Sequence, residues 1–256
     1  MNAAIALIKR ELLRLLREPT RIVALFGTTL LFWLVIGAGF ADSFAPGGAG
    51  DGTGDAAGYA GYLLPGMVLM IVLFGTIVAA IGLIQDRHDG FLQSVLVSPA
   101  PSWSVVVAKT VAGVATVLAQ TIPLLLAAPL LGVDASAGAL ALSYVGVACA
   151  ATGVLNVGLL LAWRIDSVAG FHGVMNLILL PMWLLSGALF PVDGAAGWMR
   201  VIMQINPLHW CHRVIAGSMG IGPEPGAIAW SVTLLFALVT VLACVLQIST
   251  RSAKGG

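Results

Sequence analysis

The chain has 256 residues, of which 59% are hydrophobic and only 9% are charged, and its mean hydropathy is +1.03. Soluble domains carry about 25% charged residues, so this composition excludes an ordinary soluble domain and indicates a protein that resides in lipid. The net charge of +1 gives no electrostatic footprint for nucleic acid, and we expect the lipid bilayer and no nucleic acid among its partners.

The first 20 residues predict an amphipathic helix that lies in the membrane interface. Apolar and charged side chains recur at three- and four-residue steps, so they gather on opposite faces of a helix. Pro19 ends this helix, because proline lacks an N–H donor. The apolar face holds Ile5, Ile8, Leu12 and Leu15, and the charged face holds Lys9, Arg10, Glu11, Arg14, Arg17 and Glu18.

Six apolar runs follow, each of about the 20 residues that cross a hydrocarbon core of roughly 30 Å. They predict an all-α integral membrane protein with six transmembrane helices in a single domain, 1–256. The expected spans are residues 21–40, 59–84, 103–131, 138–163, 167–190 and 227–248.

Positive charge is distributed by membrane side. Ten of the twelve Lys and Arg residues fall on loops and termini that would all face one side. By the positive-inside rule that side is the cytoplasm, so both termini are cytoplasmic and the chain is a multi-pass protein of the cell (inner) membrane. The ten are Lys9, Arg10, Arg14, Arg17, Arg21, Arg87, Lys109, Arg164, Arg251 and Lys254, and only Arg200 and Arg213 lie opposite.

The fifth run is broken near its end. Pro181 interrupts it, and Ser186 and Gly187 weaken the helix just before Phe190 and Pro191. Broken backbone at membrane depth is tolerated only where it is buried in protein or lines a cavity. This part, with the segment 192–226, is either re-entrant structure before the last span or an ordinary spanning helix with a proline kink.

Two histidines and a cysteine in that external segment raise the question of a metal site. Imidazole and thiolate ligate zinc or copper, but of His209, Cys211 and His212 only the two histidines are three residues apart on a helix. We therefore expect an external helix that starts after Asn206 and Pro207, and no metal.

The sequence lacks the common catalytic motifs. It contains no phosphate-binding loop G-x-x-x-x-G-K-[ST], no G-x-S-x-G elbow, no H-E-x-x-H helix and no pair of Cys-x-x-Cys motifs. We expect no catalytic residue and no cofactor in this chain; if the protein uses ATP, another chain binds it.

The loop after the second run, IQDRHDGFLQSVLVSPAPSWSVVVAK, is the most informative stretch. It predicts a short helix with one apolar face, tethered between two spans. Such a helix either docks its apolar face into a groove of a partner or lies among lipid head groups. The apolar face comprises Phe91, Leu92, Val95 and Leu96; a charged cluster, Asp86, Arg87, His88 and Asp89, precedes it, and Ser98 and Pro99 stop the helix.

Two stretches resemble the permeases of type-two ABC exporters. One is Asp86-Arg87-His88-Asp89-Gly90-Phe91 with Leu96-Val97-Ser98-Pro99 and Lys109, which resembles their cytoplasmic loop. The other is Leu184-Leu185-Ser186-Gly187-Ala188-Leu189-Phe190-Pro191 followed by Trp198 and Ile205-Asn206-Pro207-Leu208, which resembles the segment near their last span.

The resemblance implies a permease subunit that works as a homodimer or a closely related heterodimer. Two copies of a separate cytoplasmic ABC ATPase, which binds ATP and Mg, would drive it. The coupling helix of that family maps onto 86–98, and its interface helix, with Arg10, Arg14 and Arg17, maps onto 2–18. Ser186, Gly187, Phe190, Pro191, Asn206 and Pro207 are then the candidates for the pathway or re-entrant segment.

Expectations about the substrate follow from the spans. They hold no fixed charge for a strongly ionic solute, so we expect an amphipathic or lipid-like substrate. The alternative function is a membrane assembly or scaffold factor that transports nothing.

For the polar side chains within the spans, Gln120, Asn156, His172 and Asn176, we favour hydrogen bonds between helices over contact with substrate. An interfacial turn with an Arg164–Asp166 pair is expected between the fourth and fifth spans, near Trp163.

Overall fold

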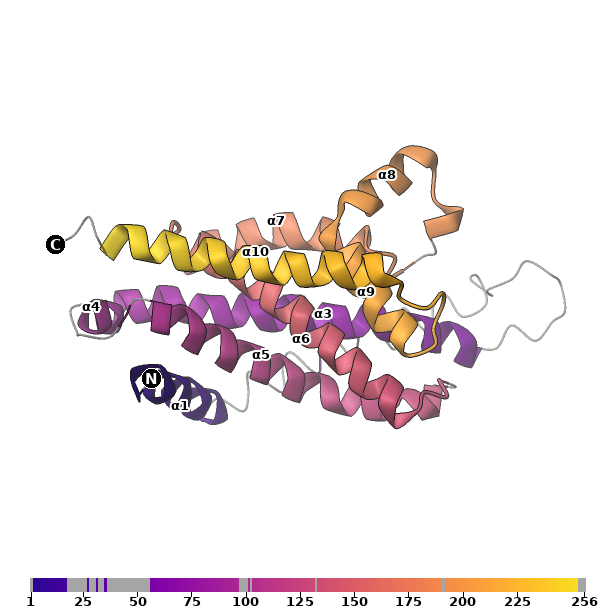
Figure 1. Cartoon of the computed structure of the whole chain (residues 1–256), viewed down its shortest axis with the longest axis horizontal. Helices are drawn as coiled ribbons and strands as arrows, with labels where there is room; N and C mark the ends of the chain where they lie inside the picture. The colour runs from indigo at the N-terminus through magenta and orange to yellow at the C-terminus, as the bar shows by residue number, and fades with distance from the viewer. Residues whose placement is uncertain are drawn as a thin grey trace, which may run out of the picture.

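The computed structural model describes residues 2–17, 27, 31, 35, 56–96, 101, 103–131, 133–189 and 192–252. Within these ranges all regular structure is helical (Figure 1). The predicted first span, 21–40, lies outside them except for three isolated helical positions. The elements are α1 (Asn2–Leu16), α3 (Ala56–His88), α4 (Phe91–Leu96), α5 (Trp103–Leu126), η1 (Ala128–Leu131), α6 (Ala137–Ala162), α7 (Val168–Leu184), η2 (Val192–Gly194), α8 (Gly197–Ile205), α9 (Pro207–Ser218) and α10 (Ala227–Ser252).

Four of these helices are long and apolar enough to cross a membrane: Gly61–His88, Trp103–Leu126, Ala137–Ala162 and Ala227–Ser249. They confirm the second, third, fourth and sixth predicted runs. The fifth run forms a shorter apolar helix, α7, of 17 residues, which is about 25 Å long at 1.5 Å per residue. The all-helical character is confirmed, with four candidate membrane spans in the part that the structure describes.

α3 is the central helix of the bundle. It packs against α5, α6 and α7, whereas α10 lies on the outside against α6 and α9. Of the most apolar window of α3, 83% is buried, compared with 22% for α10. In Figure 1, α4, α1 and the C-terminal end of α10 lie at one end of the bundle, and α8, α9 and the start of α3 lie at the other. We refer to these as the α4 end and the α8 end.

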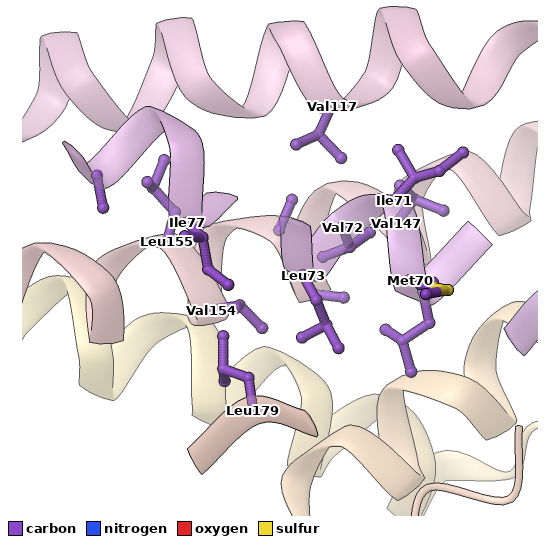
Figure 2. Close-up of a cluster of buried hydrophobic side chains, with 14 of the residues drawn as sticks. Met70, Ile71, Val72, Leu73, Ile77, Val117, Val147, Val154, Leu155 and Leu179 are labelled. Carbon is purple, nitrogen blue, oxygen red and sulfur yellow. The ribbon is translucent and has the colours of Figure 1, made fainter. Parts of the chain in front are cut away.

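The core is an apolar cluster along α3. Figure 2 shows Ile71, Val72, Leu73 and Ile77 of α3 surrounded by side chains of three other helices. Since lipid is as apolar as these side chains, dispersion contacts between closely packed neighbours stabilise the bundle more than exclusion of water does. The surrounding side chains are Val117 of α5, Val147, Val154 and Leu155 of α6, and Leu179 of α7.

Serine side chains begin two of the helices. The Ser136 hydroxyl accepts a hydrogen bond from the backbone N–H of Ala139, and that of Ser167 accepts one from Gly170, each at 3.2 Å. Both serines have extended backbone, as expected for an N-cap. Pro181 does not break α7, because it lies in the last turn and the helix ends three residues later at Leu184.

The polar side chains within the spans divide in their roles. Asn156 confirms the expected link between helices: its Oδ1 accepts a hydrogen bond from Thr110 of α5 at 3.3 Å, and its Nδ2 donates to the Thr152 carbonyl at 2.8 Å. Gln120 is buried, but its Oε1 has no hydrogen-bond partner. His172 is exposed on α7 and Asn176 is half-buried, so neither is enclosed within the bundle.

Gly66→Ala is expected to lower the free energy of unfolding by about 1–3 kcal/mol, the usual cost of overpacking a tight contact. A methyl group at Gly66 would lie 2.8 Å from the carbonyl oxygen of Ala188, and Trp183 already donates to the Gly66 carbonyl at 2.9 Å. Thermal unfolding in detergent measures the effect. Gly173→Ala in α7 is the matched control, since nothing lies within 4 Å and the change should be neutral or stabilising. Equal effects of the two substitutions would contradict the packing argument.

Candidate partner-docking site

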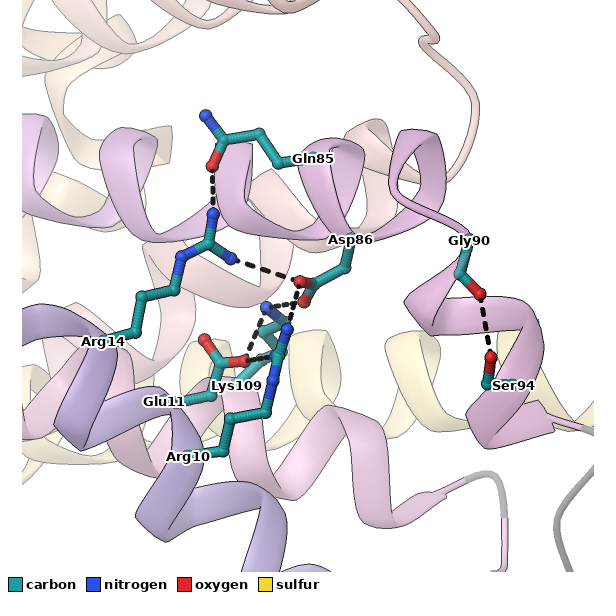
Figure 3. A network of polar contacts seen from close by, with 8 residues as sticks. All are labelled: Arg10, Glu11, Arg14, Gln85, Asp86, Gly90, Ser94 and Lys109. Carbon is teal, nitrogen blue, oxygen red and sulfur yellow. Dashed lines mark hydrogen bonds and ion pairs between the residues drawn. The ribbon is translucent and has the colours of Figure 1, made fainter.

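Asp86 is the centre of an ion cluster at the α4 end. It lies in the last turn of α3 with its side chain only 1% exposed, and it pairs with Lys109 of α5, which is 6% exposed. Arg10 and Arg14 of α1 also donate to Asp86, at 3.0 and 3.1 Å. Figure 3 shows these cations converging on the carboxylate from two helices. A buried carboxylate requires such partners, because an unpaired charge is costly away from water.

A second carboxylate completes the cluster. Glu11 Oε1 accepts from Lys109 Nζ at 3.0 Å and from Arg10 at 2.8 Å, and Arg14 also donates to Gln85 Oε1 at 2.8 Å. Three cations therefore surround two carboxylates. The cluster ties α1, the end of α3 and the start of α5 into one unit.

The turn from α3 into α4 depends on Gly90. Its φ of +72° is a left-handed backbone conformation that a residue with a side chain rarely adopts. The backbone N–H of Asp89 donates to Gln85 at 2.9 Å, that of Gly90 donates to Arg87 at 3.1 Å, and the Ser94 hydroxyl donates to the Gly90 carbonyl at 3.2 Å. α4 is thereby held at the end of α3.

The apolar face of α4 is covered by the chain itself. Leu92 is 3% exposed, and with the half-buried Phe91 and Val95 it lines a small hollow shared with α1 and α5. The guanidinium of Arg10 stacks over the Phe91 ring, 3.5 Å from its centroid. In this structure the described part of this face thus packs against α1 and α5. Leu96 ends α4, and Ser98 and Pro99 lie outside the described residues.

The opposite surface of the turn and helix is polar and open to solvent. His88, Asp89, Gln93 and Ser94 are all exposed. We call these four residues the α4 polar face. Among the residues of this predicted site that the structure describes, these four form the exposed polar surface.

Arg87 forms a second link at the α4 end. Its guanidinium pairs with Asp166 at 2.5 Å and also donates to the Ala162 carbonyl, which joins the end of α3 to the turn between α6 and α7. In place of the predicted Arg164–Asp166 pair, Asp166 pairs with Arg87 in the last turn of α3. Trp163 is 8% exposed and packs in the core, so it is buried more deeply than an interfacial anchor.

α1 presents a different face from the one that its sequence suggests. Arg10 and Arg14 face the protein because they pair with Asp86, and only Arg17 of the three predicted interface arginines is exposed. Ile5 is 57% exposed and Leu13 is 44% exposed. An outward face that carries both is compatible with a helix in the membrane interface.

The broken segment forms a second group of predicted residues, at the α8 end. Side chains satisfy the backbone carbonyls where α7 stops. Asn206 Nδ2 donates to Met182 at 2.6 Å and to Leu185 at 3.1 Å, while Tyr62 donates to Gly187 at 3.0 Å. Polar backbone at membrane depth requires such internal partners.

The same residues start α9. Asn206 Oδ1 accepts from the Leu208 N–H at 3.0 Å, and Pro207 occupies the first helical turn, where its missing N–H costs nothing. Gly187, with φ of +95°, and Ser186 form the turn after α7. The structure thus brings Ser186, Gly187, Asn206 and Pro207 together. Phe190 and Pro191 lie outside the described residues, and the segment is a break followed by short helices.

The histidines of α9 have separate environments. His209 Nδ1 donates to the Ser186 carbonyl at 2.9 Å, and His212 is 7% exposed. Burial lowers the pKa of His209, and burial beside His209 lowers the pKa of His212 to about 3, so both rings are neutral at pH 7. In the part of the chain that the structure describes, no three His, Cys, Asp or Glu side chains gather closely enough to hold a metal ion.

Sequence reasoning missed the pairing of Lys109 with Asp86 and Glu11. A signal for it is present, since Lys109 is the only charged residue within the run 103–131. A charged side chain at membrane depth predicts a counter-ion close by. The available candidates were Asp86, at the end of the preceding span, and Glu11 and Glu18 of the amphipathic helix.

Comparison with known proteins shows the family of this chain. The sequence pattern of the ABC-2 type transporter family matches residues 2–220. The "Probable multidrug ABC transporter permease YbhR" of Escherichia coli K12 is 28% identical over 156 residues, which are 59% of this chain and 41% of that protein, and the protein of that name from E. coli O157:H7 matches equally. The "transport permease ycf38" of Cyanophora paradoxa is 26% identical over 204 residues, 79% of this chain and 69% of that protein. This chain therefore belongs to the ABC-2 type transporter family.

Proposed function

We propose that this chain is the membrane-spanning subunit of an ATP-driven exporter, and that a separate ABC ATPase docks on the α4 polar face. Membership of a transporter family whose relatives are named permeases supports the transport role. The α4 end is the cytoplasmic side in this proposal, because it carries most of the Lys and Arg residues. Both termini then lie in the cytoplasm of a cell whose inner membrane holds the protein.

The observation that carries the proposal is the ion cluster around Asp86. It fixes the turn before α4 to α1 and α5, so a push on α4 acts on three helices together. A rigid unit of this kind can transmit the closure of an ATPase dimer, whereas a loosely attached loop would absorb it.

α3 offers a route for that movement to the other end of the bundle. Tyr62 and Asp86 are 24 residues apart on one helix, a distance of about 36 Å. At its start, α3 contacts the break after α7 through the Tyr62–Gly187 hydrogen bond and the last turn of α7 through the Trp183–Gly66 hydrogen bond. A shift at α4 would therefore reach the broken segment through one continuous helix.

The substrate in this proposal is amphipathic or lipid-like, and it passes between two copies of the chain. The described spans carry no charged side chain between their ends apart from Lys109, which is paired. α7 exposes Leu177, Ile178 and Leu180 and is a better candidate for lining the pathway than α3, most of which is buried. A homodimer served by two ATPase copies follows from the resemblance to type-two exporters.

Capture of the partner tests the proposal. The tagged chain is purified from its own cell in mild detergent, and the proteins that accompany it are identified by mass spectrometry. A phosphate-loop ATPase in equimolar amount is expected, with ATP hydrolysis that is stimulated when the complex is reconstituted into vesicles. Recovery of membrane-assembly proteins without any ATPase would instead support a scaffold function and overturn the exporter.

A further inference from the structure

A cavity of about 460 Å³ opens at the α8 end, remote from the ion cluster. Its walls come from the start of α3, the break after α7, helices α8 and α9, and the loop before α10. Its polar lining is cationic and neutral: Arg200, Gln204, His209, His212 and Arg213 contribute side chains, and the described lining residues include no carboxylate.

A buried donor or acceptor in this cavity lacks a partner. His212 is 7% exposed, yet its Nε2 makes no hydrogen bond within the protein. Burying such a group without a partner costs about 1–3 kcal/mol. Since the ring lines the cavity, a molecule bound there can supply the missing partner. The low pKa of His212 keeps the ring neutral at pH 7, so Nε2 can serve a ligand without carrying charge itself.

α8 indicates what surrounds the cavity. Its apolar residues form one stripe that faces outward, with Trp198 65%, Val201 56% and Ile205 77% exposed. Its polar residues Arg200 and Gln204 are four positions apart and line the cavity. A helix with an exposed apolar face in a membrane protein lies in the boundary between head groups and acyl chains. The cavity mouth is thereby placed at the depth of lipid phosphates.

The geometry points to a binding site for the phosphate group of an anionic phospholipid. Arg213 pairs with the phosphate, His212 Nε2 hydrogen-bonds an oxygen of the same head group, and the acyl chains lie along the apolar face of α8. Guanidinium groups bind phosphate through charge-assisted hydrogen bonds that are about twice as strong as neutral ones. That the lipid comes from the outer leaflet rests on the proposed orientation, whereas binding itself does not.

Native mass spectrometry of the purified chain without any ATPase tests this site. The probes are phosphatidylglycerol, phosphatidylcholine with the same acyl chains, diacylglycerol and inorganic phosphate. Phosphatidylglycerol is expected to bind the most tightly, and diacylglycerol not to bind specifically. Arg213→Gln should weaken phosphatidylglycerol binding about tenfold. His212→Phe, which keeps a buried ring but removes Nε2, should also weaken it while the melting temperature is maintained.

Arg164→Gln is the matched control, since Arg164 is exposed in the turn after α6 and remote from the cavity. It should leave lipid binding unchanged. Equal losses in Arg164→Gln and Arg213→Gln would overturn the site, as would equal binding of phosphatidylglycerol and diacylglycerol. A third outcome is that inorganic phosphate binds, that Arg213→Gln abolishes this binding, and that no lipid is preferred over another. The site would then bind free phosphate, and the assignment to a phospholipid would be overturned. Because no ATPase is present, neither result depends on the exporter function.

Discussion

Asp86→Asn is expected to lower the free energy of unfolding by about 3–5 kcal/mol, the usual cost of removing one partner from a buried ion pair. Three cations converge on this carboxylate, and Lys109 is the most deeply buried of them at 6% exposed. Arg10 and Arg14, at 35% and 28% exposed, can be hydrated when the carboxylate charge is lost, so they contribute less to the loss in free energy of unfolding. The Lys109 ammonium, which then keeps only Glu11 as a counter-ion, therefore accounts for most of the effect. Thermal unfolding of the detergent-solubilised variant measures it.

Two further variants separate the charge effect from packing. Asp86→Asn combined with Lys109→Met removes both buried charges and should recover at least half of the lost stability, because a neutral pair needs no compensation. Glu11→Gln should cost only about 1 kcal/mol, since Lys109 retains Asp86. If the free energy of unfolding of Asp86→Asn lies within about 0.5 kcal/mol of the wild-type value, the cluster does not stabilise the α4 end.

The sequence predicted the spans well because their cause is local. A run of about 20 apolar residues must be helical in lipid, whatever surrounds it. α6, Ala137–Ala162, agrees with the predicted run 138–163 to within one residue at each end. α7 differs by six residues at its end, because apolar character continues to Phe190 while Gly187 already requires a turn. Hydropathy locates apolar sequence and does not show where the backbone leaves the helix.

The contacts of the candidate site were harder to predict than the spans, because they depend on which helix faces pack against one another. The spacing of Phe91, Leu92 and Val95 correctly indicates one apolar face, yet periodicity is the same whether the face contacts a partner, lipid or α1. Likewise the sequence pattern puts Arg10 and Arg14 on a solvated charged face, whereas in the structure both donate hydrogen bonds to Asp86. Tertiary contacts decided both cases, and the hydrogen bonds of Arg10 and Arg14 to Asp86 join residues 76 and 72 positions apart in sequence.

Asp89→Lys is expected to reduce the amount of co-purified ATPase about thirtyfold. Asp89 is exposed on the α4 polar face, so reversing its charge should change the stability of the chain by less than about 0.5 kcal/mol. A partner that covers this face would bury a charge of the wrong sign, at a cost of about 2 kcal/mol or more. Quantitative mass spectrometry of the captured complex, relative to the chain itself, measures the loss.

Two comparisons make this result specific to the α4 polar face. Asp134→Lys carries the same charge change at an exposed aspartate in the loop before α6, at the opposite end of the bundle, and should leave ATPase capture intact. Leu92→Asp should reduce the amount of folded protein, because it places a carboxylate at a position that is 3% exposed. If Asp89→Lys and Asp134→Lys recover equal amounts of ATPase, the partner docks elsewhere. The ion cluster around Asp86 would then act in folding and not in coupling.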